Sequence, residues 1–151
     1  MSSAASPRVW RSAAAVVCAA WAAHLAAAPA DAVECGADLP AHRLVARGPG
    51  GGAEAVAFVP DPAPLALGRH FRLRGEVCGP VRLLRVDADM PAHRHGMNYR
   101  PTLRADGAGR FEAAGLLLHM PGRWRIRFEV ESAGQPGAGA RQWLDVEVEL
   151  R

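Results

Sequence analysis

Apolar and charged residues alternate with a period of two along much of the chain after residue 53. The alternation is clearest in residues 123–130, where Trp124 and Ile126 are flanked by Arg123 and Arg125. This pattern is typical of antiparallel strands that turn one face toward a core and the other toward water. It predicts strands at residues 53–59, 70–77, 81–87, 99–105, 110–118, 123–130 and 142–150.

Turn-forming residues separate these stretches at intervals of roughly 8–12 residues. They include Cys78-Gly79-Pro80, Asp106-Gly107 and Pro121-Gly122. No stretch after residue 30 has a helical period long enough to require a helix. We therefore predict an all-β protein with an immunoglobulin-like antiparallel β-sandwich of about seven strands. A short strand at 44–47 is expected to pair through the glycine-rich turn at 48–52.

The beginning of the chain has the composition of an export signal. Arg8 and Arg11 precede an apolar run at 12–28, and Ala28-Pro29-Ala30 offers the small residues that signal peptidase cleaves. Ala30-Asp31-Ala32 offers a second site. An uncleaved membrane anchor is the alternative, for which the run is short and weakly hydrophobic. We expect an exported, periplasmic protein with a signal peptide, a loosely held leader and one domain, at residues 1–30, 31–52 and 53–151.

Net charge gives little reason to expect a nucleic-acid partner. All 18 basic residues are arginine, and there are 15 acidic residues. Removal of the signal peptide takes Arg8 and Arg11 away and leaves a net charge of +1. Nucleic-acid binding requires a clustered basic face, which a nearly neutral chain does not indicate.

Removal of the signal peptide would also leave two cysteines, Cys35 and Cys78. Two cysteines in an oxidising compartment most often form one disulfide. A pair of thiolate metal ligands is the alternative, and the absence of C-x-x-C spacing disfavours it. We therefore predict a structural disulfide between Cys35 and Cys78.

Histidine and methionine are concentrated in two of the predicted loops. One loop runs from Met90 to Met97, and the other contains His119-Met120. If successive strands reverse direction, both loops leave the same end of the sandwich. In an extended segment, His93 and His95 would point to the same side. Imidazole and thioether together suit Cu(I), whereas imidazole with oxygen suits Cu(II). The predicted metal ligands are His93, His95, Met97, His119, Met120 and Met90.

A metal-free interpretation of these loops stays open. Met90 and Met120, each followed by proline, could fill gaps at the end of the core. Loop histidines are often solvated surface residues, as we expect for the isolated histidines His42 and His70. Positive charge beside the first loop, from Arg94 and Arg100, would also disfavour a bound cation.

Catalysis is not expected from the sequence. After residue 30, serine occurs only as Ser132, so a serine nucleophile with a base is implausible. Asp87 and Asp89 could supply oxygen ligands or hydrogen-bond partners for imidazole. No partner for acid–base chemistry accompanies them. We therefore expect a binding protein rather than an enzyme.

Several motifs between residues 86 and 130 are shared with a known family. They are Met90-Pro91 with its histidine-rich turn, Gly109-Arg110-Phe111, and the Met-x-Gly-x-Trp motif at Met120, Gly122 and Trp124. With these motifs the chain resembles the YtkA-like domain family, related to FixH-type proteins, over residues 54–150. The resemblance implies an exported immunoglobulin-like β-sandwich, often associated with copper handling or cytochrome oxidase maturation. That family has no agreed set of metal ligands.

Two functions are consistent with these observations. The first is a periplasmic copper carrier or chaperone that serves a copper-receiving or membrane redox protein. The second is a metal-free interaction module that assists a membrane or redox complex. Trp143, on the outward face of the last predicted strand, would then be a candidate contact. A monomer is expected in both cases.

Overall fold

The computed structural model describes residues 34–48, 54–132 and 140–151. The predicted signal peptide and both of its cleavage sites lie outside the described residues. None of the described helices is both long enough and apolar enough to cross a membrane.

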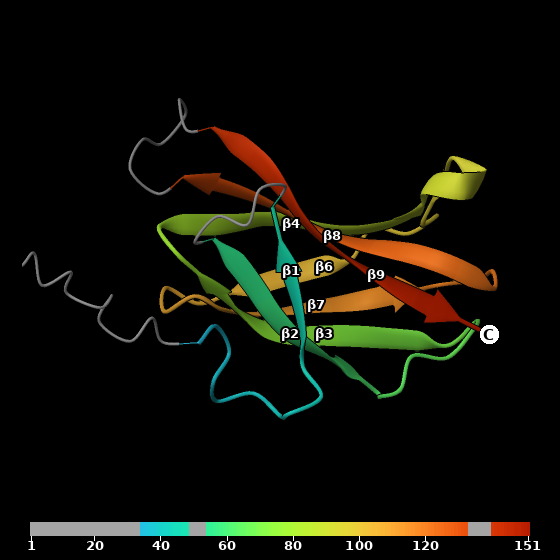
Figure 1. The fold of residues 1–151 in the computed structure, drawn as a ribbon, viewed down its shortest axis with the longest axis horizontal. Coiled ribbons are helices and arrows are strands. Elements are labelled where there is room, and N and C mark those ends of the chain that lie inside the picture. Colours follow the sequence, from blue (N-terminus) through green and yellow to red (C-terminus); the bar gives the residue numbers. More distant parts are fainter. Residues whose placement is uncertain (1–33, 49–53, 133–139) are drawn as a thin grey trace, which may run out of the picture. The chain divides into compact units, whose positions relative to one another are not determined.

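The described residues form nine β-strands and one short 3₁₀ helix (Figure 1). Every stretch that the alternation identified is a strand, although the boundaries shift by a few residues. The short helix and β5 were not predicted. The elements are β1 (Leu44–Arg47), β2 (Ala55–Asp61), β3 (His70–Cys78), β4 (Val81–Met90), η1 (Pro91–His93), β5 (His95–Gly96), β6 (Thr102–Ala105), β7 (Arg110–Leu117), β8 (Gly122–Ser132) and β9 (Arg141–Leu150).

All strand pairs are antiparallel, and they join into one sheet in the order β5-β4-β8-β9-β1-β2-β3-β7-β6. The prediction of an all-β antiparallel fold is therefore confirmed. The sheet is continuous because β1 pairs with β2 along its length and with β9 through Arg47 and Asp145. A two-residue alternation of apolar and polar positions identifies half-buried strands, but it does not show which strands pair. The position of β1 between β9 and β2 therefore could not be predicted from the alternation.

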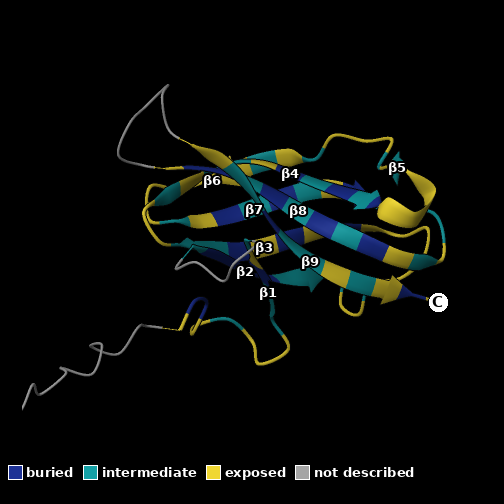
Figure 2. Ribbon diagram, turned by 45° about the horizontal axis from the view of Figure 1, so that its top comes forward, coloured by how far each residue is buried: buried dark blue, intermediate teal, exposed yellow. Residues whose placement is uncertain are grey.

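The sheet curls so that its two halves enclose a common core (Figure 1). Buried side chains occupy alternate positions of the long strands, as Figure 2 shows along β8. Phe128 of β8 contacts two other aromatic rings in the core. Its ring centroid lies 5.0 Å from that of Phe58 in β2 and 5.8 Å from that of Phe111 in β7. These contacts join β8, in one half of the sheet, to β2 and β7 in the other half. The core therefore lies between the two halves.

A disulfide joins Cys35, in the turn before β1, to Cys78 at the end of β3. The Cα atoms are 5.8 Å apart, and the predicted pairing is confirmed. The described part of the predicted leader, residues 34–48, therefore belongs to the folded domain. Its disulfide and its strand β1 attach it to the sheet.

Candidate functional site

The two loops that carry histidine and methionine meet at one end of the sheet. Nε2 of His95, the first residue of β5, lies 2.7 Å from Nε2 of His119, in the turn between β7 and β8. The ring centroids are 4.7 Å apart, and both side chains are half-buried. Figure 1 shows η1 at the same end as the β7–β8 turn. The prediction that these loops converge is confirmed.

A tight reversal after β4 places His95. Pro91–His93 form the 3₁₀ turn η1, and Arg94 then takes a left-handed conformation with φ of 49°. The chain returns along β4, so that His95 pairs with Met90, and the Met97 amide donates to the Ala88 carbonyl at 3.0 Å. His95 is therefore the cross-strand neighbour of a core methionine.

Trp124 fixes the other side of the site. Its side chain is fully buried, and its indole Nε1 donates to the carbonyl of Met120 at 2.9 Å. The turn closes through Gly122, whose φ of +113° few other residues adopt. The indole centroid lies 5.7 Å from the ring of His119 and 6.3 Å from that of His95. The indole is thus an apolar wall beside the histidine pair, a role that its alternation pattern alone did not indicate.

The contact between the two imidazoles limits their protonation. One Nε2 must donate a hydrogen and the other must accept it, so only one Nε2 carries a hydrogen in this contact. Nδ1 of His119 is buried and has no hydrogen-bond partner within the described residues. The fold thus brings the two Nε2 atoms into direct contact. A cation bound to both lone pairs would replace the shared hydrogen.

The separation of the two nitrogens is close to that of a metal site. Two ligands at about 2.0 Å in tetrahedral geometry hold their nitrogens about 3.3 Å apart. The rings would therefore separate by roughly 0.6 Å to admit an ion. Small rotations of the two half-buried side chains would produce such a shift without moving the sheet.

The remaining predicted histidine ligand is not part of this contact. His93 is exposed at the end of η1, and within the described residues it has no hydrogen bond to His95 or His119. The expected orientation of His93, toward the same side as His95, requires an extended segment. The 3₁₀ turn replaces that extended segment. His42 and His70 are exposed, as predicted. In the part of the chain that the structure describes, no three His, Cys, Asp or Glu side chains converge on one point.

The three methionines of the two loops are buried to different depths. Met90 is a core residue, 1% exposed, and its terminal methyl lies close to Gly122. Met97 and Met120 are half-buried and pack against the core. Met120 follows His119 directly, and Met97 is two residues from His95. Packing therefore accounts for Met90, while Met97 and Met120 are only partly buried and each lies within two residues of a histidine of the pair.

Similarity to known proteins does not assign this site. No protein-family model matches the chain, and no curated protein or solved structure is detectably similar to it. The resemblance to the YtkA-like family stays a prediction. What the site does must be inferred from its own side chains.

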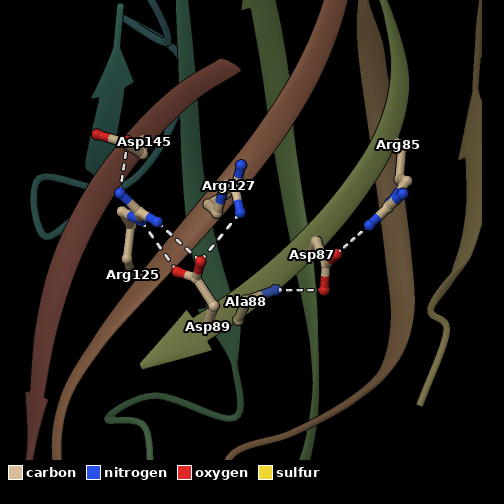
Figure 3. Close-up of polar contacts among 7 residues, drawn as sticks. All are labelled: Arg85, Asp87, Ala88, Asp89, Arg125, Arg127 and Asp145. Atoms are coloured by element: carbon tan, nitrogen blue, oxygen red, sulfur yellow. Dashed lines mark hydrogen bonds and ion pairs between the residues drawn. The ribbon is translucent and has the colours of Figure 1, made fainter. Parts of the chain in front are cut away.

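The two aspartates near the first loop bind arginines (Figure 3). Asp87 pairs with Arg85, and Asp89 accepts from Arg125 at 2.8 Å and from Arg127 at 3.0 Å. Both carboxylates are thus neutralised on the outer face of β4 and β8. Because arginines engage both groups, neither is left as a free oxygen ligand.

The interactions of Asp89 make the stability of the fold depend on pH. Partial burial would raise the pKa of Asp89, but the hydrogen bond from Arg125 and the charges of Arg125 and Arg127 outweigh it and lower the pKa below 3.8. A lowered pKa stabilises the fold above the unfolded value of about 3.9, and this stabilisation is lost as the pH falls through the folded value.

We expect Asp89→Asn to lower the free energy of unfolding at pH 7 by about 2 kcal/mol. The difference from the wild type should shrink as the pH falls below about 4. Urea unfolding at several pH values measures both effects. Asp38→Asn is the control, because Asp38 is exposed and has no ion pair within the described residues. A constant difference between Asp89→Asn and the wild type across this range would contradict the assignment.

Trp143, the candidate contact of the metal-free hypothesis, is only half-exposed. It lies on the outer face of β9, with the Arg127 guanidinium 4.2 Å and the Arg85 guanidinium 5.4 Å from the ring. Cation–π contacts of this kind stabilise the outer face and partly cover the indole. A partner would have to displace two guanidinium groups to reach it.

Proposed function

We propose that this protein is an exported copper-binding protein that holds one Cu(I) ion between His95 and His119. The observation that carries the proposal is the 2.7 Å approach of the two Nε2 atoms, which come from loops 24 residues apart in sequence. A half-buried thioether from Met97 or Met120 would complete the coordination, with Met90 behind them. The ion would take the place of the hydrogen that the two imidazoles share.

The surroundings of the pair favour Cu(I) over a divalent ion. Soft thioether and imidazole groups are ligands that Cu(I) prefers. No carboxylate of the described residues compensates the charge, since Asp87 and Asp89 are bound by arginines. Transfer of a charge into such surroundings is costly, and the cost is smaller for one positive charge than for two. The buried indole of Trp124 adds a polarisable face to the site.

Export and family membership belong to the same proposal. The Cys35–Cys78 disulfide is typical of an oxidising compartment, and the N-terminal residues have the pattern of a signal peptide. The curled antiparallel sheet is compatible with an immunoglobulin-like domain of the YtkA-like kind. A carrier rather than an enzyme fits a site at the rim of the sheet, where an ion can enter and leave.

A metal-free interaction module is the second candidate. The observation that favours it is the burial of Met90, together with the lack of three converging His, Cys, Asp or Glu side chains in the described residues. In this case the histidine contact would close the end of the core. Metal titration separates the two candidates.

Titration of the signal-free protein with Cu(I), in competition with a chromophoric chelator, tests the proposal. We expect one tightly bound equivalent. His95→Ala and His119→Ala should each weaken binding about a hundredfold, the loss of about 2.7 kcal/mol that removal of one strong ligand would produce. Binding should also quench Trp124, and a Trp143→Phe background isolates its emission from that of the second indole.

The matched control removes two histidines that make no contact with the pair within the described residues. His42→Ala/His70→Ala should bind one equivalent as tightly as the wild type, because both side chains are exposed and neither contacts His95 or His119. Thermal unfolding of each metal-free variant establishes that the fold is retained. Equal copper binding by the His119→Ala variant and the wild type would reject the site.

A further inference from the structure

Charged side chains without ion-pair partners are distributed unevenly over the domain. Most arginines and carboxylates are paired across neighbouring strands, and these pairs cancel locally. Within residues 34–48, 54–132 and 140–151, three acidic side chains take part in no ion pair: Asp38, Glu54 and Glu76. Six arginines in the same residues also lack one: Arg47, Arg69, Arg94, Arg100, Arg104 and Arg151.

The unpaired acidic side chains lie toward the disulfide. Glu54 directly precedes Ala55, which pairs with Cys78, and Glu76 is two residues before Cys78. Asp38 is in the turn that contains Cys35. This end of the sheet is opposite the end that carries the histidine pair (Figure 1).

Three of the unpaired arginines lie in segments at the same end of the sheet as the histidine pair. Arg94 directly precedes His95. Arg69 follows Gly68, whose amide donates to the carbonyl of Leu118 at 2.8 Å, next to His119. Arg100 follows Tyr99, whose ring lies 6.1 Å from that of His70 at the start of β3. Three of the six unpaired arginines of the described residues therefore lie at this end of the sheet, whereas the three unpaired acidic side chains lie at the other end.

Exposed apolar side chains gather at the same place. Among the described residues, the large hydrophobic side chains that are strongly exposed are Leu67, at 42%, and Tyr99, at 48%. Leu67 lies two residues before Arg69, and Tyr99 lies beside Arg100. We call Leu67, Arg69, Arg94, Tyr99 and Arg100 the arginine rim. Tyrosine and arginine are the residue types that protein interfaces favour.

We propose that the arginine rim docks an acidic protein surface, through which a partner exchanges Cu(I) with the histidine pair. The exchange of copper rests on the proposed function, whereas the docking of an acidic surface does not depend on it. Complementary charge steers such encounters and raises their rate, and a rim around the site brings the partner directly to the ion. Weak, salt-dependent association suits a carrier that must also release its partner.

The composition of the rim fits a protein surface better than a lipid one. Lipid recognition by charge uses clusters of about four to eight basic residues beside an amphipathic or membrane-spanning helix. The rim has three arginines on loops, and the helix in its vicinity, η1, has three residues. The two exposed apolar side chains, one aromatic and one aliphatic, are a small anchor of the kind found in transient protein complexes.

Two synthetic peptides provide the test. Both contain the same methionine-rich Cu(I)-binding segment, flanked by glutamates in one peptide and by glutamines in the other. In the first arm, each peptide is titrated into the metal-free ¹⁵N-labelled protein. We expect only the glutamate peptide to shift amide signals of the arginine rim, with binding that weakens as salt is raised. This arm requires no copper.

In the second arm, the copper-loaded protein is mixed with each peptide, and the recovery of Trp124 emission follows the transfer. We expect transfer to the glutamate peptide to be about tenfold faster at low salt. Equal rates and equal amide shifts for the two peptides would overturn the docking proposal even if copper binds. Rim-specific shifts in a protein that binds no copper would instead leave the docking face standing and reject the proposed function.

A matched pair of double variants assigns the effect to the rim. Arg69→Gln/Arg94→Gln should abolish most of the preference for the glutamate peptide. Arg47→Gln/Arg104→Gln removes the same charge from unpaired arginines outside the rim and should retain the preference. Equal loss in both variants would show a net-charge effect and overturn the proposal. The domain is also sedimented with phosphatidylglycerol vesicles. If it binds the vesicles, loses this binding in Arg69→Gln/Arg94→Gln and shows no preference between the peptides, the docking proposal is overturned in favour of a lipid surface.

Discussion

Replacement of both Cys35 and Cys78 by serine is expected to lower the free energy of unfolding by about 4 kcal/mol. The two residues are 43 apart in sequence, so the disulfide restricts a long loop of the unfolded chain. It also attaches the segment before β1 to the end of β3. Urea unfolding of the oxidised wild type and the double serine variant measures the difference.

The reduced wild type is the control for this experiment, and it should unfold like the double variant. Copper affinity should not change in the double serine variant, because the end of β3 that carries the disulfide lies opposite the β7–β8 turn (Figure 1). A large loss of copper affinity would revive the alternative in which these cysteines are thiolate ligands. An unfolding free energy within 1 kcal/mol of the wild type would contradict the structural role.

Gly75→Ala is expected to destabilise the domain by about 3 kcal/mol. Gly75 lies in β3 between Phe58 of β2 and Phe111 of β7. A Cβ atom there would lie 2.2 Å from the carbonyl oxygen of Ala57 and 2.7 Å from the ring of Phe111. The backbone cannot move away without disturbing the β2–β3 pairing. The Phe111 ring would have to leave its contact with Phe128.

Gly107→Ala is the matched control for this substitution. Gly107 lies in the turn before β7, and a Cβ atom there would have nothing within 4 Å. It should unfold within about 0.5 kcal/mol of the wild type. Thermal or urea unfolding of the two variants is sufficient. Equal stabilities would show that the aromatic cluster around Phe128 tolerates a shift of β3.

The strands could be predicted from the sequence because their faces have unequal surroundings. In β8, Trp124, Ile126 and Phe128 are buried while the arginines between them reach solvent. Alternation records this difference directly. The continuity of the sheet depends on the single pair between Arg47 and Asp145, and nothing in the period of either strand indicates it.

The convergence of the two loops could be predicted from strand reversal, but the composition of the site could not. The expected position of His93 assumed an extended segment, whereas Pro91 starts a 3₁₀ turn that Arg94 ends in a left-handed conformation. Local turn geometry of this kind leaves no periodic signal. The alternation and the Met-x-Gly-x-Trp motif predict that Trp124 faces the core. Its place beside both imidazoles depends on the Met120 carbonyl that its indole binds.

Trp143 shows the same limit on the outer face. Its outward direction could be predicted from alternation in β9. The covering by Arg85 and Arg127 depends on the register of β4, β8 and β9, which brings three separate stretches of the chain together. The arginine rim likewise arises from loops that are distant in sequence. Net charge alone gave no indication of it.

Copper K-edge X-ray absorption of the protein loaded with one equivalent of Cu(I) tests the central claim most directly. We expect imidazole nitrogens at about 2.0 Å together with at least one sulfur at about 2.3 Å. The imidazole contribution should fall in the His119→Ala variant and persist in the His42→Ala/His70→Ala variant. A spectrum with sulfur ligands alone, or one that His119→Ala leaves unchanged, would contradict a copper site between His95 and His119.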